Sequence, residues 1–541
     1  MSIHQIDLSN PRRVKRRLQL AFGTMLLGIC LPCFALAAGD FAERAALPAG
    51  LSQADWRSIE AANSIAQEAY LKASNTDASD LFGVSIAVAG DTVIVGAFRE
   101  DSSATGVNGN QANNSADESG AAYVFVRSGS SWVQQAYLKA SNTEEGDTFG
   151  SVVAISGNTI VVGAPAEASS TTGVNGLQTD NSAPGSGAAY VFVRSGSVWT
   201  QQAYLKASNT NMNDAFGFSV AVSGDTVVVG ANIEASNAVG VNGNQADNSA
   251  LQAGAAYVFV RSGNVWTQQA YLKASNTNTA DNFGYAVSVS GETIVVGALQ
   301  ERSNATGVNG NQANNSLLSA GAAYVFTRTG STWSQQAYLK ASNTELRDQF
   351  GSSVAVSGDT ALVGAIGEDS SAVGVNGNQT DNAASGAGAA YVFVRSGSVW
   401  SQQAYLKASN SNANDTFGFA LALDADTVVV GSPFEESNAL GINGNQLDNS
   451  APGAGAAYVF GRSGTAWKQR AYLKASNTDA GDAFAGSVAV SGGTGLVGAA
   501  GEASTANGVG GNQASNAATF AGAAYAFGVP SLIFANGFEG N

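Results

Sequence analysis

One feature constrains this 541-residue chain more than any other: the stretch Tyr-Leu-Lys-Ala-Ser-Asn occurs seven times at a constant spacing of 67 residues. The copies begin at Tyr70, Tyr137, Tyr204, Tyr271, Tyr338, Tyr405 and Tyr472. A second tyrosine, followed by apolar residues, recurs with the same spacing from Tyr123 to Tyr525. Copies that repeat without insertion or deletion indicate a repeat architecture, in which each copy contributes one structural unit to a larger array.

Each repeat contains four predicted short strands. In the first repeat they cover residues 82–88, 93–97, 121–126 and 132–140. Short Gly-containing turns follow the first and third strands, so consecutive strands should pair antiparallel. A long polar loop, residues 99–120, joins the second strand to the third. The second and third strands are apolar at successive positions, which indicates that both faces of each sheet are covered.

The chain ends favour a closed ring over an open array. The N-terminal copy begins with a lone fourth strand, residues 67–73, and the last copy has no fourth strand after Phe527. A ring resolves this mismatch because the N-terminal strand can complete the last sheet, whereas an open solenoid would need capping units. We therefore predict an all-β fold: a seven-bladed β-propeller of four-stranded antiparallel blades, closed by the N-terminal strand in the last blade.

Four segments are predicted along the chain: a signal peptide in 1–37, a linker that could form a short helix in 38–64, the propeller in 65–528, and a tail in 529–541. The first segment has basic residues from Arg12 to Arg17, an apolar run and a small-residue cleavage site at 35–37. This pattern is typical of an export signal of a Gram-negative bacterium. An uncleaved membrane anchor is the alternative.

Removal of residues 1–37 would change the available chemistry. Cys30, Cys33 and His4, the only cysteines and histidine, lie in that segment. The remaining chain would have no disulfide, thiol nucleophile, imidazole base or His/Cys metal site. The segment carries five positive charges and one negative, so its removal takes the formal net charge from −16 to −20. Such an acidic chain disfavours nucleic acid and suits cationic partners.

The strand motifs resemble those of a known family. A Phe-Gly pair opens the first strand, Val-Gly-Ala closes the second, and Tyr-Val-Phe lies in the third, as in the FG-GAP repeat of integrin-alpha-like β-propellers, including bacterial secreted types. The phenylalanines are Phe82, Phe149, Phe216, Phe283, Phe350, Phe417 and Phe484. Gly follows six of them, and Ala485 follows the last. The resemblance covers about residues 65–528 and implies a propeller with a binding or adhesion role.

One departure from the family concerns calcium. Calcium-binding members carry a D-x-D-x-D-G loop between the first and second strands. Here that connection is only four residues long, as at 223–226, and offers a single carboxylate. One carboxylate cannot supply the six to eight oxygen ligands that calcium takes. We therefore do not expect the family calcium site in this chain, and no metal ligand is predicted.

The long loops are the predicted binding region, because binding usually resides on loops held by a rigid scaffold. A glutamate recurs at Glu100, Glu167, Glu234, Glu301, Glu368, Glu435 and Glu502. Further along each loop, the pattern G-V-N-G-N-Q-x-D-N-S places candidate residues at Asp180, Asp247, Asn248, Asp381 and Asp448. The strand order puts all seven loops on one face. Three interpretations stay open: turn formation by Asn and Gly, calcium held by oxygen ligands, and direct contact with a glycan or protein.

Three other series recur with the repeat. Asp80 and its six equivalents precede the Phe-Gly pair and are predicted to accept backbone N–H bonds in the turn before the first strand. Lys72 and its equivalents are predicted to be solvent-exposed charges on the outer strand. The six tryptophans from Trp132 to Trp467 either stack on sugars or, in the favoured interpretation, pack between the outer strands.

These observations predict a secreted or cell-surface binding or adhesion scaffold without catalytic residues. Its expected partner is a multivalent protein or glycan surface ligand, not nucleic acid, and no membrane span is expected after signal cleavage. No cofactor is expected, although calcium could bind in the long loops. A calcium-dependent, lectin-like carbohydrate binder is the alternative. A carboxylate-based hydrolase is a third class, disfavoured because an acid and a base need different environments, whereas seven near-copies provide similar ones.

Overall fold

The computed structural model describes residues 64–530, within which Ile65–Val529 form one compact unit. The predicted signal peptide, the linker helix and residues 531–541 of the predicted C-terminal tail fall outside the described residues, whereas Val529, the first residue of that tail, is buried against blade 7. The described part is all-β, as predicted, with 28 strands. None of its elements is a helix with the length and apolar character needed to cross a membrane.

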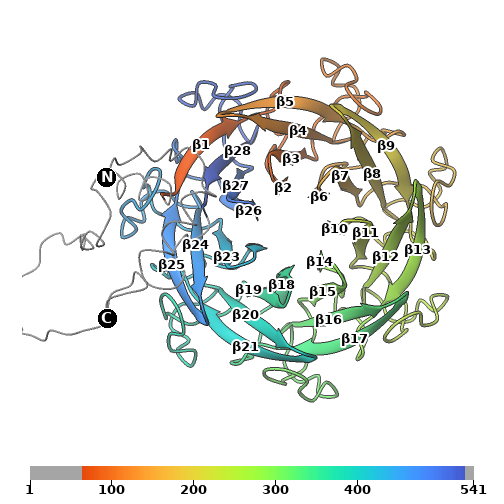
Figure 1. Ribbon diagram of the computed structural model, residues 1–541, viewed down its shortest axis with the longest axis vertical. Coiled ribbons are helices and arrows are strands. Elements are labelled where there is room, and N and C mark those ends of the chain that lie inside the picture. Colours follow the sequence, from red (N-terminus) through yellow and green to blue (C-terminus); the bar gives the residue numbers. More distant parts are fainter. Residues whose placement is uncertain (1–63, 531–541) are drawn as a thin grey trace, which may run out of the picture. The chain divides into compact units, whose positions relative to one another are not determined.

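The strands form seven four-stranded antiparallel sheets arranged as blades in a ring (Figure 1). The strands of each blade are given below in order from the innermost, next to the axis, to the outermost. Blade 1 contains β2 (Ser85–Ala89), β3 (Thr92–Ala97), β4 (Ala121–Ser128) and β5 (Ser131–Leu138); blade 2 contains β6 (Val152–Ser156), β7 (Thr159–Ala164), β8 (Ala188–Ser195) and β9 (Val198–Leu205). Blade 3 contains β10 (Ser219–Ser223), β11 (Thr226–Ala231), β12 (Ala255–Ser262) and β13 (Val265–Leu272); blade 4 contains β14 (Ala286–Ser290), β15 (Thr293–Ala298), β16 (Ala322–Thr329) and β17 (Thr332–Leu339). Blade 5 contains β18 (Phe350–Ser357), β19 (Thr360–Ala365), β20 (Ala389–Ser396) and β21 (Val399–Leu406); blade 6 contains β22 (Ala420–Asp424), β23 (Thr427–Ser432), β24 (Ala456–Ser463) and β25 (Ala466–Leu473). Blade 7 contains β26 (Phe484–Ser491), β27 (Thr494–Ala499), β28 (Ala523–Gly528) and β1 (Ala66–Leu71).

Blade 7 closes the ring by combining the two ends of the repeat region. Strand β1 pairs antiparallel with β28, and Tyr70 lies opposite Tyr525. The N–H of Lys72 also donates to the carbonyl oxygen of Gly508, at 2.7 Å. The N-terminal strand thus supplies the missing outer strand of the last blade, which confirms the predicted closure.

The glycine of the Phe-Gly pair lets neighbouring blades meet backbone to backbone near the axis. Gly83 has a φ of +92°, and a Cβ there would lie 2.2 Å from the carbonyl oxygen of Ala523 in blade 7. At the five equivalent glycines this distance is 2.1–2.4 Å. The left-handed backbone also explains one error: the strand predicted from Phe82 begins at Ser85 in blade 1, because ladder pairing starts only after this turn.

Three aromatic side chains form the centre of each blade. In blade 1, Phe82, Tyr123 and Tyr137 are fully buried, with ring centroids 5.4 Å apart for the first pair and 5.3 Å for the second. Strand β3 is buried at every position, as expected for a sheet covered on both faces. Each apolar cluster combines residues of two adjacent blades. A blade therefore completes its core only against its neighbour, as the repeat architecture requires.

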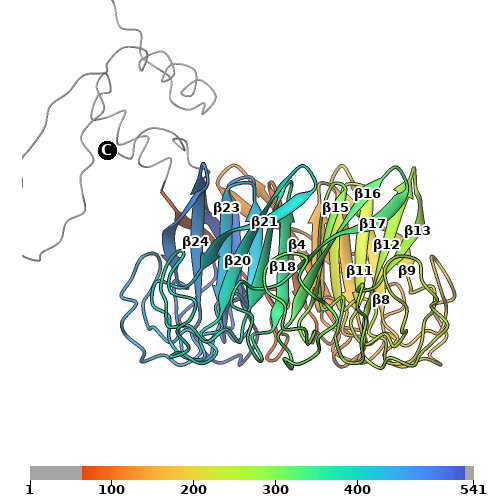
Figure 2. The same ribbon diagram turned by 90° about the horizontal axis from the view of Figure 1, so that it is seen from below.

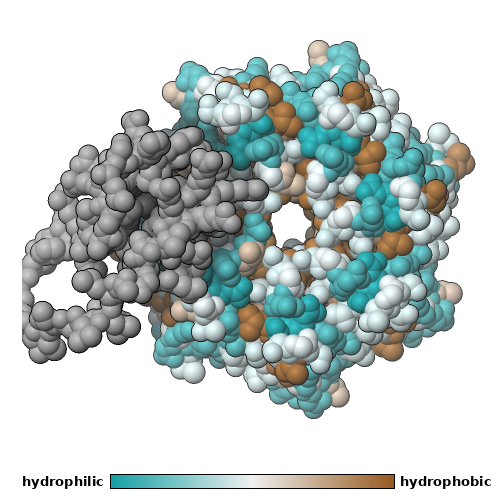
Figure 3. All heavy atoms as spheres, in the orientation of Figure 1, coloured by the Kyte–Doolittle hydropathy of each residue, from teal (hydrophilic) through white to brown (hydrophobic). Residues whose placement is uncertain are grey.

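The connections lie at two opposite rims of the ring. Short turns join β2 to β3 and β4 to β5, and the equivalent strands in other blades, at one rim. The long loops between second and third strands gather at the other rim, the lower one in Figure 2. We call this the loop face, and its existence confirms that all seven long loops share one face. The ring surrounds an opening on its axis (Figure 3).

Candidate functional site

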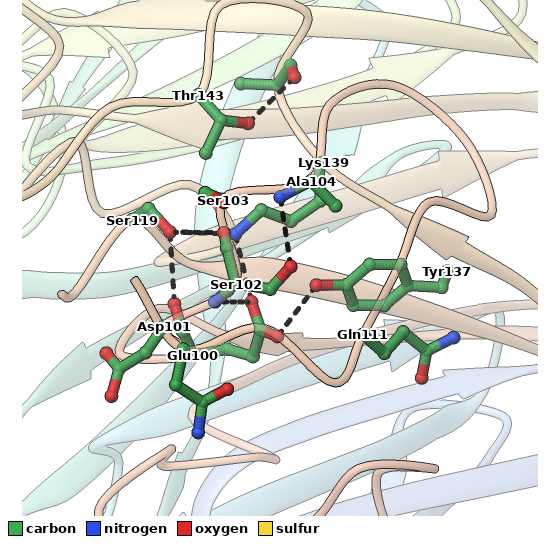
Figure 4. A network of polar contacts seen from close by, with 12 residues as sticks. Glu100, Asp101, Ser102, Ser103, Ala104, Gln111, Ser119, Tyr137, Lys139 and Thr143 are labelled. Atoms are coloured by element: carbon green, nitrogen blue, oxygen red, sulfur yellow. Dashed lines mark hydrogen bonds and ion pairs between the residues drawn. The ribbon is translucent and has the colours of Figure 1, made fainter. Parts of the chain in front are cut away.

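Glu100, the first of the predicted loop glutamates, lies inside blade 1 with its side chain 1% exposed (Figure 4). Tyr137 from β5 donates its hydroxyl to Oε1 of Glu100 at 2.7 Å, and Nζ of Lys139 lies 2.9 Å from Oε2. Lys139 is fully buried and also donates to Oγ of Ser119, at 2.8 Å. These groups form a buried polar assembly, which we call the Lys–Glu–Tyr network.

The Lys–Glu ion pair of this network occurs in all seven blades, with Nζ–Oε2 distances of 2.9–3.0 Å and every side chain at most 1% exposed. The pairs are Lys139–Glu100, Lys206–Glu167, Lys273–Glu234, Lys340–Glu301, Lys407–Glu368, Lys474–Glu435 and Lys72–Glu502. The prediction that Lys72 and its equivalents are solvent-exposed is therefore wrong. The lysine turns inward after the outer strand because a buried carboxylate is there to balance its charge.

The network also connects adjacent blades. Asn75 follows β1 of blade 7, and its side-chain N–H group donates to Oε1 of Glu100 in blade 1, at 2.9 Å. The hydroxyl of Tyr123, on β4 of blade 1, donates to Oδ1 of Asn75 at 2.6 Å. The Asn that ends each Tyr-Leu-Lys-Ala-Ser-Asn stretch therefore joins its own blade to the next one. These contacts account for the constancy of the Tyr, Lys and Asn in the stretch.

Burial limits the ability of the seven glutamates to bind a ligand. Both carboxylate oxygens of Glu100 already accept hydrogen bonds from the chain, and the N–H of Ser102 adds another to Oε2 at 3.2 Å. A ligand would have to displace a buried lysine to reach this carboxylate, at the cost of leaving that charge unpaired. Ligand binding by the glutamates stays a prediction, and the structure gives them a clear role in joining strands and blades.

Asp80 and its equivalents accept backbone N–H bonds, as predicted. In blade 1 the N–H of Asp77 lies 3.0 Å from Oδ2 of Asp80, which is 2% exposed. Burial raises the pKa of Asp80 to about 8, against the opposing effect of that hydrogen bond. Burial likewise raises the pKa to about 7 at Asp147, Asp214, Asp281, Asp348, Asp415 and Asp482. These carboxyl groups therefore titrate near neutral pH. Because their environments and pKa values are similar, no two of them are set apart as a catalytic acid and a catalytic base.

The four aspartates predicted in the outer part of the loops form turns. The side chains of Asp180, Asp247, Asp381 and Asp448 accept the N–H of the residue two positions later, at 2.8–3.0 Å. Such bonds are typical of Asp side chains in turns, and ligand binding by these residues stays a prediction. All four are partly exposed and Asn248 is exposed, so these residues reach the solvent. Hydrogen bonds from serines lower the pKa of Asp180 and Asp247, which are therefore charged at neutral pH.

The tryptophans pack between outer strands. In blade 2 the indole N–H of Trp199 donates to Oε1 of Gln135 in blade 1, at 2.8 Å. The guanidinium of Arg194 lies 5.1 Å from the centre of the Trp199 ring, and the six tryptophans are only 2–6% exposed. The packing interpretation is therefore confirmed. Stacking on a sugar would require a ring face that is already covered.

The Lys–Glu–Tyr network was not predicted from the sequence, although the spacing of its residues carries a signal. Six of the seven glutamates have a lysine 39 residues later in the chain, as in Glu100 and Lys139, and Glu502 is the exception because the ring closure pairs it with Lys72. Within residues 64–530, no group of three or more His, Cys, Asp or Glu side chains is arranged to hold a metal ion. Calcium in the long loops would also draw on amide and backbone oxygens, and it stays a prediction.

Comparison with known proteins identifies the repeat. The sequence profile of the FG-GAP repeat matches six segments, which are residues 65–125, 132–192, 199–259, 266–326, 333–393 and 400–460. Together they span more than half of the chain. The last copy, in which Ala485 replaces the glycine, lies outside the matched segments. No curated protein matches the chain. Each matched segment joins the outer strand of one blade to the first three strands of the next, and because the matches cover more than half of the chain, the chain belongs to the FG-GAP repeat family.

Proposed function

We propose that this protein is a non-catalytic binding scaffold, exported to the cell surface or the medium, which holds a surface partner through the outer loops of its ring. We define the outer loops as residues 106–115 and the six equivalent segments. An FG-GAP β-propeller fits a binding role. The observation that carries the proposal is the presentation of seven similar polar loops by one rigid ring on one face.

The outer loops are held in place by the blades, which supports a binding role. In blade 1 the N–H of Asn108 donates to the carbonyl oxygen of Tyr137 at 2.8 Å, and its side-chain oxygen accepts the N–H of Tyr137 at 2.9 Å. The side chain of Asn114 donates to Asp77, at 2.9 Å. Loops already fixed in one conformation lose little entropy when a ligand binds. A weak contact made by such a loop therefore contributes more to the net binding free energy than the same contact made by a flexible loop.

The number of loops favours a repetitive partner. Linked sites can raise the overall affinity by roughly 10² to 10⁴ without any new contact, provided that the geometry allows simultaneous engagement. A glycan or a polymeric surface can present many identical chemical groups to the seven loops at once, whereas one small molecule cannot. Since the tryptophans are buried, sugar contact would be made by Asn and Asp side chains of the outer loops. Adding and removing calcium in the binding assay separates the calcium-dependent lectin from a calcium-independent scaffold.

The test compares one altered loop with four. The full chain is screened against immobilised glycans and surface polymers, and the best binder is retained as the probe. One variant carries Asp247→Ala with Asn248→Ala, and a second carries the same change at 180/181, 247/248, 381/382 and 448/449. We expect a modest loss of affinity for the first variant and loss of detectable binding for the second, with unchanged melting temperatures. Complete loss with one loop, or full binding with four altered loops, would contradict the proposal.

A further inference from the structure

Nine positions at the ends of the strands on the loop face differ strongly in chemical character among the seven copies. In blade 3 these are Met212, Asn213, Ala215, Phe218, Asn232, Ile233, Ala235, Leu251 and Gln252. At the equivalent positions, other copies have charged, aromatic, small or proline residues, while the strands and the buried network stay nearly constant. The nine positions are therefore where blades of almost identical structure acquire different surfaces.

These positions come together on the loop face around the axis. The N–H of Asn213 donates to the carbonyl oxygen of Pro184, which occupies one of the nine positions of blade 2, at 3.0 Å. The ring of Phe218 lies 5.1 Å from the ring of Tyr285, its equivalent in blade 4. Phe218 directly precedes β10, an innermost strand, so this position lies nearest the axis, whereas Leu251 and Gln252 lie shortly before β12, the third strand of the blade. We call the combined positions of all blades the inner loop surface.

The part of this surface contributed by blades 3 and 4 exposes several large apolar side chains among polar residues and carries one basic residue, Arg302. Met212 is 57% exposed, Phe218 36%, Leu251 64% and Leu318 45%, and the partly buried Tyr285 packs against Phe218. None of the inner-surface positions in these two blades is acidic. Large apolar side chains that remain exposed together on a folded protein mark an interaction site.

The part contributed by blades 1 and 2 is acidic. Four inner-surface positions carry carboxylates, namely Asp101, Asp117, Glu118 and Glu145. Asp77 and Glu144, both exposed, directly adjoin the same loop positions. Arg99 is the single basic residue at these positions, and its Nε lies 3.3 Å from Oε1 of Glu118. The net charge of this part is therefore negative, next to the apolar part in the adjacent blade.

We infer that the inner loop surface binds one polypeptide segment that has basic residues at one end and aromatic or branched apolar residues at the other. The basic end lies on blades 1 and 2, where opposite charge steers the encounter and fixes the orientation. The apolar end covers Phe218, Tyr285 and Leu251, because large exposed aromatic residues dominate binding energies at interfaces. The acidic part meets the packed rings of Phe218 and Tyr285 at the junction of blades 2 and 3, whereas the other exposed aromatic residues of this surface, Phe419, Phe434 and Phe520, lie in blades 6 and 7. The site does not depend on the proposed repetitive partner, although Asn114 and Asn181 of the outer loops donate hydrogen bonds to Asp77 and Glu144 beside the acidic part.

The test uses a labelled synthetic peptide with four lysines followed by alternating leucine and phenylalanine, titrated against the full chain by fluorescence anisotropy at low and high salt. The apolar variant is Phe218→Ser with Tyr285→Ser, because serine occupies the equivalent positions 151 and 352. The acidic variant is Asp117→Ser, Glu118→Ser and Glu145→Ala, also residues found at equivalent positions. The matched control, Phe419→Ser with Phe434→Gly, removes an exposed aromatic pair of blade 6, outside both parts.

We expect the apolar variant to weaken peptide binding at least ~10-fold at either salt concentration. The acidic variant should weaken binding at low salt and remove most of its salt dependence. The blade 6 control and the four-loop variant should bind the peptide as the unaltered protein does, so the two proposals can fail independently. Equal binding of a peptide with glutamates in place of lysines, equal binding of a lysine-only peptide, or unchanged affinity in either variant would overturn the inference.

Discussion

The Lys–Glu–Tyr network and the inner loop surface lie in the same blades, yet they differ in how much the seven copies vary. The ion pair of the network has the same residues and nearly the same distances in every blade. The side chains of the inner loop surface differ between blades, from the acidic Glu145 in blade 2 to the aromatic Phe218 in blade 3, although the strand topology of the blades is the same. The constant region lies between strands and blades, and the variable region faces solvent.

The difference shows which residues the ring itself requires. A buried glutamate cannot change alone, because its lysine would remain as an unpaired charge in the core. An exposed inner-surface residue has no such partner in most blades, so it can change at little cost in stability. Variation among internal copies thus separates residues that hold the ring from residues that are free to meet a partner.

Deleting residues 64–75 should produce the largest effect on stability. It removes β1 from blade 7, exposes the edge of β28, and leaves Glu502 without Lys72. The loss should exceed the about 3–5 kcal/mol expected for breaking a single buried pair. Chemical denaturation of chains beginning at residue 64 and at residue 76 measures it. Equal unfolding free energies for the two chains would contradict the closed ring.

Glu234→Ala should have the next largest effect, because it leaves Lys273 buried and unpaired. We expect a loss of about 3–5 kcal/mol in unfolding free energy. The double variant Glu234→Leu with Lys273→Met should regain part of this loss, since no unpaired charge remains. Glu436→Ala, a partly exposed acidic neighbour of Glu435, is the control and should stay within about 0.5 kcal/mol.

The buried aspartates should make the ring less stable as the pH rises. Burial raises the pKa of Asp281 to about 7, whereas an unfolded aspartate has a pKa of about 3.9. Between these values the folded chain retains a proton that the unfolded chain has lost, so the unfolding free energy falls as the pH rises from about 4 to about 7. Asp281→Asn should reduce that slope by up to ~1.4 kcal/mol per pH unit. An identical slope in the variant and the unaltered protein would count against a buried, protonated Asp281.

Removing calcium should have the smallest effect. The first hairpin of each blade lacks the calcium loop of calcium-binding family members, and lysine already balances the charge of each loop glutamate. We therefore expect the melting temperature to be the same in chelator and in calcium. A fall of many degrees in chelator would place a metal in the long loops, and repeating the measurement with Asp247→Ala would test one ligand.

Local contacts and the pairing of repeated strands could be predicted from the sequence, whereas individual side-chain contacts between distant residues could not. The turn bond of Asp80 joins residues three positions apart, so residue type and position were sufficient. The 67-residue spacing and the missing last strand likewise predicted the closed ring. The burial of Lys139 depends on Glu100, 39 residues earlier in the chain, and a lysine after an outer strand gives no sign of that partner. The inner loop surface was also missed, because only the structure brings its nine positions together.

The most direct test of the account compares unfolding free energies after changes in the two regions of blade 3. One variant carries Met212→Leu, Phe218→Ser and Leu251→Ser, which are the residues of blade 5 at those positions. The other carries the single change Glu234→Ala. We predict that the triple variant stays within about 1 kcal/mol of the unaltered protein, while the single variant loses about 3–5 kcal/mol. Equal losses, or a larger loss in the triple variant, would contradict the separation of a constant region that holds the ring from a variable region that meets a partner.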